Sequence, residues 1–129
     1  MKLIILFSLF FSAFSYGADV CQDITTSDQI FLCSKNKKNT ADKYLNEQYS
    51  SLLSKVNSEY VNDDLLKRDF LNKIKMAQRN WLKFRDSNCE LYSFQIDSKS
   101  QAYQTSLNEC IAKMSESRGR ELAEFSNGM

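Results

Sequence analysis

Polar side chains interrupt the apolar helix faces that the sequence predicts, and these residues are its first candidates for chemistry. In "AQRNWLKFRDSNCE", residues 77–90, the spacing puts Gln78 and Arg85 on the same face as Trp81, the single tryptophan. At about 100° per residue, Arg85 lies roughly 40° from Trp81 and Gln78 roughly 60° from it. Arg118 repeats this pattern within a later apolar stripe. These groups could form a buried network or a binding site.

A buried guanidinium needs a partner, because burying an unpaired one costs several kcal/mol. Antiparallel helices that fold back near residues 61–62 and 98 would bring Arg85 within about a turn of Asp42. The same register places Arg118 near the level of Gln78 and near Asn46 or Tyr49. Glu121, one turn after Arg118 on the same helix, is another candidate acceptor. We interpret the motif as a structural polar layer, with a groove that faces a ligand or partner and an exposed seam as the alternatives.

Other chemistry has little support. No histidine is present to act as a base near neutral pH, and no glycine-rich loop could cradle a phosphate. The basic cluster "SKNKK" at 34–38 lacks the interleaved aromatic residues and the positive balance of a nucleic-acid binder. We therefore expect no catalytic residue, no metal, no cofactor and no nucleic-acid partner.

Four cysteines, Cys21, Cys33, Cys89 and Cys110, predict two disulfides, each worth about 2–4 kcal/mol. A metal site is the alternative, and it is disfavoured because histidine and a close cysteine pair of the zinc type are both missing. The antiparallel register gathers Cys33, Cys89 and Cys110 at one end of the bundle, where Cys21 can also reach. It leaves their pairing open.

The first 17 residues have the pattern of a secretory signal peptide, with one lysine, an apolar run and small residues at its end. We expect cleavage after Gly17 and a periplasmic or secreted protein made of residues 18–129 as one domain. Val20 precedes Cys21, which argues against a lipid anchor. Cleavage removes one of the 17 basic residues and none of the 16 acidic ones, so the exported chain is formally neutral.

The absence of proline and the presence of only three glycines favour helices. We expect three, in an all-α antiparallel three-helix bundle stapled by disulfides. The first begins at a capping box of Thr26 and Gln29 and ends before "VNDD" at 61–64, and a break near Asn39 is left open. The second runs from about Leu65 to Ile96, and the third follows "DSKS" at 97–100 and ends near "SNGM".

Apolar residues recur three and four positions apart in each segment, and this spacing predicts the buried face of each helix. The first stripe is Ala41, Leu45, Tyr49, Leu52, Val56 and Tyr60. The second is Leu71, Ile74, Gln78, Trp81, Arg85, Cys89, Tyr92 and Ile96. The third is Tyr103, Leu107, Ile111, Met114, Arg118, Leu122 and Phe125.

The combined pattern resembles a known family. Cys33, "LNEQY" at 45–49, "AQRNWLKFRDSNC" at 77–89, Cys110 and "SRGREL" at 117–122 are similar to the LprI-type lysozyme-inhibitor domain family of exported bacterial proteins. The resemblance covers nearly all of residues 18–129, and it implies a small helical, disulfide-linked envelope domain. Carried over by position, it marks as signature residues, which we expect to be structural, Asn46, Tyr49, Gln78, Trp81, Arg85, Asp86 and Arg118.

The resemblance implies a non-enzymatic protein that occludes a lysozyme or another muramidase. An interaction or immunity protein against a different secreted toxin is the alternative, and an enzyme acting on the cell wall ranks last. Host lysozymes are strongly basic, so an inhibitor is expected to present an acidic patch. The obvious acidic groupings are "NDD" at 62–64 and Glu116, Glu121 and Glu124. An exposed aromatic residue such as Phe94 would be a contact candidate.

Overall fold

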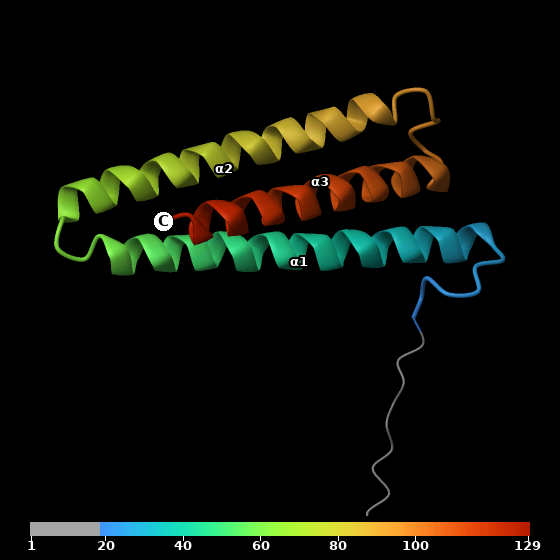
Figure 1. The fold of residues 1–129 in the computed structure, drawn as a ribbon. Coiled ribbons are helices and arrows are strands. Elements are labelled where there is room, and N and C mark those ends of the chain that lie inside the picture. The colour runs from blue at the N-terminus through green and yellow to red at the C-terminus, as the bar shows by residue number, and fades with distance from the viewer. Residues whose placement is uncertain (1–18) are drawn as a thin grey trace, which may run out of the picture.

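Three long helices make up the fold. The structure, a computed structural model, describes residues 19–129, in which α1 spans Ser27–Glu59, α2 Asp64–Tyr92 and α3 Gln101–Asn127. The chain runs up, down and up, so α1 and α3 are parallel to each other and lie side by side, while α2 contacts both less extensively (Figure 1). The expected all-α antiparallel three-helix bundle is confirmed. The signal peptide expected at 1–17 lies outside the described residues.

The helices begin where local sequence sets them. In the capping box of α1, the Gln29 backbone N–H donates to Thr26 Oγ1 at 3.3 Å and the Thr26 N–H donates to Gln29 Oε1 at 3.0 Å. Asp63 and Ser100 cap α2 and α3 by accepting from the backbone N–H three residues on, at 2.9 and 3.1 Å. α1 continues through Asn39 without a break, which settles the question that the sequence left open.

The end of α2 differs from the expectation. The helix stops at Tyr92 and not near Ile96, because Ser93 leaves the helix as its cap and its buried hydroxyl hydrogen-bonds the hydroxyl of Ser106 at 2.8 Å. Tyr92, which was expected on the buried stripe, is 76% exposed. The chain therefore turns toward α3 one helical turn earlier than the apolar spacing suggested.

The buried face of α3 also differs from the expected stripe, except at Leu122, which both share. The buried residues are spaced four and three apart and are mostly small, namely Asn108, Ala112, Ser115, Gly119, Leu122 and Ser126. The large residues of the expected stripe flank this face, and Phe125 is 50% exposed. Small side chains let two helices approach closely. The pattern of large residues was therefore a poor guide to α3, because its closest contact with α1 is made by small ones.

Gly119 lies at a point where α3 approaches α1 closely. A Cβ built on this residue would lie 2.6 Å from Cδ1 and Cε1 of Tyr44 on α1, which is closer than carbon atoms pack. Any larger residue would require the Tyr44 ring to move. Glycine is used here for space between two helices.

The apolar core and the disulfides lie in opposite halves of the bundle. The core consists of Leu45, Leu52, Val56, Ile74 and Leu122, surrounded by partly buried aromatic and aliphatic side chains. At the other end, Cys21 pairs with Cys33 and Cys89 with Cys110, so the pairing that the sequence left open is defined. Each covalent link is worth about 2–4 kcal/mol, in a region that holds few large buried side chains. The disulfides thus compensate for a core that occupies only one half of the bundle.

Gly119→Ala tests the packing of α3 against α1. Helix propensity alone would make alanine more stable by about 0.5–1 kcal/mol. We expect the opposite sign, a loss of about 1–3 kcal/mol in the free energy of unfolding, because the new methyl group displaces the Tyr44 ring. Urea denaturation measures this difference. In a Tyr44→Ala background the same substitution should be neutral or stabilising, and a stabilising effect in the wild-type background would contradict the packing account.

Candidate functional site

Two arginines flank the single tryptophan in the middle of the bundle. The guanidinium carbons of Arg85 and Arg118 lie 5.6 and 5.8 Å from the ring centroid of Trp81, which is the range of a cation–π contact. Trp81 also packs against the apolar core. The indole therefore lies at the boundary between the core and the polar groups that the sequence singled out.

Arg85 joins all three helices through one hydrogen-bonded triangle. Its Nη1 donates to Asp42 Oδ1 on α1 and to Ser115 Oγ on α3, both at 3.0 Å. Ser115 Oγ in turn donates to the same Asp42 oxygen at 2.7 Å. The Arg85 side chain is only 11% exposed, so these bonds form in surroundings where a charge is poorly solvated. The Arg85 side chain therefore links the three helices by hydrogen bonds and is not a surface group.

The remaining donors of Arg85 face a second carboxylate. Nε and Nη2 donate to Asp86 Oδ1 at 2.9 and 2.8 Å, and the Asp86 side chain is 56% exposed. Two carboxylates, Asp42 and Asp86, thus face one guanidinium. The cluster carries one net negative charge, of which the buried part is neutral and the excess lies toward solvent.

The donors of Arg118, which lies closer to the core, also have hydrogen-bond partners. Its Nε donates to Gln78 Oε1 at 3.3 Å and its Nη1 to Glu121 Oε2 at 2.9 Å, and Gln78 is 6% exposed. Within residues 19–129, every buried side-chain nitrogen or oxygen has a hydrogen-bond partner. We call this network the polar layer, and it consists of Asp42, Gln78, Trp81, Arg85, Asp86, Ser115, Arg118 and Glu121.

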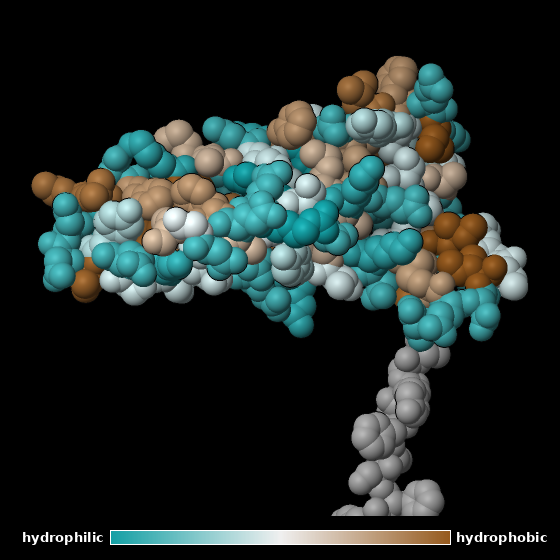
Figure 2. All heavy atoms as spheres, in the orientation of Figure 1, coloured by the Kyte–Doolittle hydropathy of each residue, from teal (hydrophilic) through white to brown (hydrophobic). Residues whose placement is uncertain are grey.

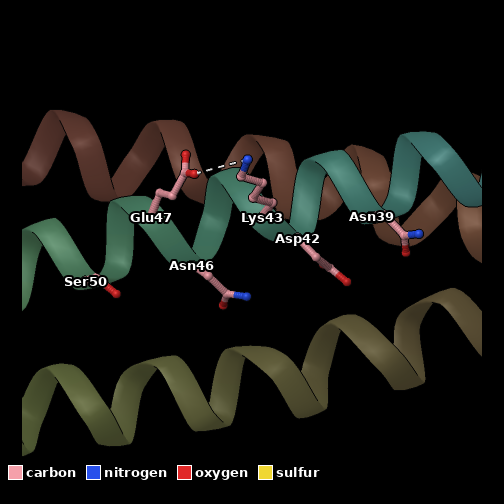
Figure 3. Close-up of a pocket in the computed structure, with 6 residues that line it drawn as sticks. All are labelled: Asn39, Asp42, Lys43, Asn46, Glu47 and Ser50. Atoms are coloured by element: carbon pink, nitrogen blue, oxygen red, sulfur yellow. Dashed lines mark ion pairs between the residues drawn. The ribbon is translucent and has the colours of Figure 1, made fainter. Parts of the chain in front are cut away.

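A shallow polar hollow lies on α1 beside this layer. It has a volume of about 670 Å³ and is lined by Asn39, Asp42, Lys43, Asn46, Glu47 and Ser50. Figure 3 shows Asn39, Asp42, Asn46 and Ser50 pointing toward the side on which α2 lies. Lys43 and Glu47 point away from it and form an exposed ion pair at 3.9 Å. The hollow offers amide and hydroxyl groups for polar contacts, and it is too open to enclose a small molecule.

The shifted carboxylate at the start of α2, Asp64, stabilises the first turn of that helix. The pKa of Asp64 is lowered from its ordinary value, first by the hydrogen bond from Lys67 and then by the charges of Lys67 and Arg68. The Asp64 side chain is 78% exposed and lies far along α2 from the polar layer. We interpret this carboxylate as part of the first turn of the helix, where a negative charge is favoured.

The part of the chain that the structure describes holds no arrangement of three or more His, Cys, Asp or Glu side chains suited to a metal ion. Nor does any helix there contain an apolar run long enough to cross a bilayer. The polar layer holds the three helices in place relative to one another, since its donors point at acceptors on other helices or on neighbouring turns.

Most of the contacts expected from the sequence are present. The pairings of Arg85 with Asp42, Arg118 with Gln78 and Arg118 with Glu121 are confirmed. Tyr49 is half-buried beside the core, as a structural residue would be. Asn46 is different, because it is exposed in the hollow and lies outside the polar layer. The acceptors of Arg118 are Gln78 and Glu121, whereas Asn46 does not take the place beside Arg118 that the sequence suggested, and its role as a signature residue stays a prediction.

Ser115 was missed. It follows Met114 and so lies one position off the apolar stripe that the sequence suggested for α3. Its hydroxyl is fully buried and bridges Arg85 to Asp42. The available signal was the run of small residues at four- and three-residue spacing, which predicts a close helix contact.

Comparisons with known proteins agree with the fold. A family model described as lysozyme inhibitor LprI matches residues 19–122. An uncharacterised protein of Rhizobium meliloti (strain 1021) is 26% identical in an alignment of 108 residues that covers 81% of this chain and 77% of that protein. A crystal structure of a DUF1311 family protein from Pseudomonas putida KT2440 superposes with a TM-score of 0.72 at 26% identity, covering 81% of this chain and 97% of that one.

Arg85→Ala and Arg118→Ala should lower the melting temperature more than Lys75→Ala, an exposed substitution on the same helix as Arg85. Removing Arg85 leaves Asp42 and Ser115 without their shared donor, and we expect a loss of about 1–3 kcal/mol. Arg118 is more exposed, at 21%, and should cost about 1 kcal/mol. Thermal denaturation followed by circular dichroism measures the difference. Equal melting temperatures for all three variants would contradict a structural role for the layer.

Proposed function

The chain belongs to the lysozyme inhibitor LprI family, and from this premise we propose that it is an exported, non-enzymatic protein that inhibits a lysozyme or another muramidase by occluding its cleft. The observation that carries the proposal is the family match, which spans residues 19–122 and so includes α1, α2 and most of α3. Nearly all of the described chain therefore matches one domain, and the family of that domain is named for lysozyme inhibition.

Two features support export of the protein to the bacterial envelope. Residues 1–17 have the pattern of a cleavable signal, and the chain beyond them contains two disulfides, of which one joins the segment before α1 to α1 and the other joins α2 to α3. Disulfides form and persist outside the reducing cytosol. Both features fit a protein that meets wall-cutting enzymes in the bacterial envelope.

The interior supports a binding role over a catalytic one. Arg85 and Arg118 are directed at side chains of the protein itself, and so is the carboxylate of Asp42. A general acid or base has to reach a substrate atom at about 2.6–3.2 Å. Groups committed to holding helices together are poorly placed for that role, whereas a rigid helical body suits a protein that blocks a cleft.

A titration of lysozyme with the oxidised, exported protein tests the proposal. We expect the rate at which a basic animal lysozyme clears a suspension of bacterial cells to fall with added protein and to level off near one equivalent. The physical reason is that a bound protein excludes the glycan strand from the cleft.

The matched control is the same protein reduced and alkylated, which should lose inhibition together with its fold because the disulfide half lacks a large apolar core. Unchanged clearing in a large molar excess of the oxidised protein would remove the proposal for the lysozymes tested. A pull-down from periplasm would then identify the protein that this fold does bind.

A further inference from the structure

The disulfide-bonded end of the bundle is strongly acidic although residues 19–129 are neutral overall. We define the disulfide end as residues 19–34 and 88–112, which hold the start of α1, the end of α2, the following turn and the start of α3. This end carries one basic residue, Lys99, and six acidic ones, Asp19, Asp23, Asp28, Glu90, Asp97 and Glu109, for a net charge of −5. The rest of residues 19–129 holds 15 basic and 10 acidic residues, so its net charge is +5.

The acidic groupings expected from the sequence do not form a comparable patch. Glu116 pairs with Arg120 at 2.6 Å, and Glu121 pairs with Arg118 at 2.9 Å. At the other turn, Asp64 pairs with Lys67 at 2.7 Å, and Asp63 caps α2. Neighbours on the same helix neutralise most of these charges. The disulfide end was not apparent from sequence because its carboxylates come from two separate segments, 19–34 and 88–112.

Large apolar side chains are exposed at this same end. Leu91, Tyr92 and Phe94 are 71%, 76% and 81% exposed and surround a shallow hollow of about 460 Å³ with Asn88 and Gln95. Figure 2 shows apolar residues gathered over the end of α2 and, below it, over the start of α1. Exposed aromatic and aliphatic side chains that cluster in this way mark interaction surfaces.

The exposed residues stand on a rigid base. Cys89, which is fully buried, links the last turns of α2 to α3 through Cys110, and Ser93 hydrogen-bonds Ser106. Gln101 Nε2 donates to Asp28 Oδ1 at 2.9 Å and so ties the start of α3 to the start of α1. A surface held in place before binding loses less conformational entropy when a partner docks.

We propose that the disulfide end is the surface that docks on the lysozyme, with Leu91, Tyr92 and Phe94 as apolar anchors and the carboxylates of the same end facing basic residues of the enzyme. This inference rests on the proposed function. A strongly basic partner matches an end of net charge −5, which also speeds association. A symmetric contact with the disulfide end of a second copy is disfavoured, because two ends of net charge −5 repel each other.

Variants of the anchors provide the first test. Tyr92→Ala combined with Phe94→Ala, and Leu91→Ala alone, should each weaken binding of a basic animal lysozyme by about tenfold or more. Leu65→Ala is the matched control for Leu91→Ala, because Leu65 is the second residue of α2, is 75% exposed and lies at the opposite end of the bundle. Isothermal titration calorimetry measures the dissociation constants, and thermal denaturation checks that each variant is folded.

A charge reversal provides the second test. Glu90→Lys should raise the dissociation constant and reduce its dependence on salt, since it removes a negative charge beside the anchors. Glu59→Lys is the matched control, because it also places a lysine in the last turn of a helix but at the far end. We expect the two controls to bind within about twofold of wild type.

The outcomes separate the two proposals. Wild-type inhibition together with unchanged binding in the anchor and Glu90 variants would overturn the docking surface and leave the proposed function standing. No binding or inhibition by wild type would remove the proposed function, and the docking surface with it. Self-association in analytical ultracentrifugation that the anchor variants abolish, with lysozyme binding unchanged in them, would assign this end to a second copy and also overturn the inference.

Discussion

The arrangement of the three helices depends on a charge that is almost removed from water. Arg85 is 11% exposed, and its guanidinium lies between α1 and α3 with Asp42 and Ser115 as partners. A charge in that position is tolerated only where its donors are satisfied. The requirement is directional, because only one placement of α2 brings Arg85 to both partners. The polar layer therefore sets how α2 sits on the other two helices, even where apolar contacts are few.

The same constraint explains how the molecule divides along its length. The large apolar side chains gather near the turn between α1 and α2, the polar layer lies in the middle, and the disulfides close the far end. α1 and α3 need less help, because small residues such as Ala112 and Gly119 allow them to pack closely. Most of the signature residues expected from the sequence, such as Gln78, Trp81 and Arg85, lie inside this body, where their side chains contact other helices. The exposed side chains of Leu91, Tyr92 and Phe94 are not among these signature residues.

Much of the fold could be predicted from the sequence, because its strongest signals are local or periodic. The capping box at Thr26, the missing proline and the antiparallel register led to three helices and to the pairing of Arg85 with Asp42. The face of α3 could not be predicted in the same way, since spacing of large residues does not show that Ser115 and Gly119 make the closest contact. The acidic end was hidden for a different reason. Its carboxylates are far apart in sequence, and only the fold brings them to one place.

A double-mutant cycle between Asp42 and Arg85 tests most directly whether the buried charge pair holds α2 in place. Urea denaturation of wild type, Asp42→Ala, Arg85→Ala and the double variant measures the coupling between the two side chains. The account predicts a coupling energy of about 1 kcal/mol or more, because each single substitution strands the other group in a poorly solvated position. Substitutions that add to within about 0.3 kcal/mol would contradict it.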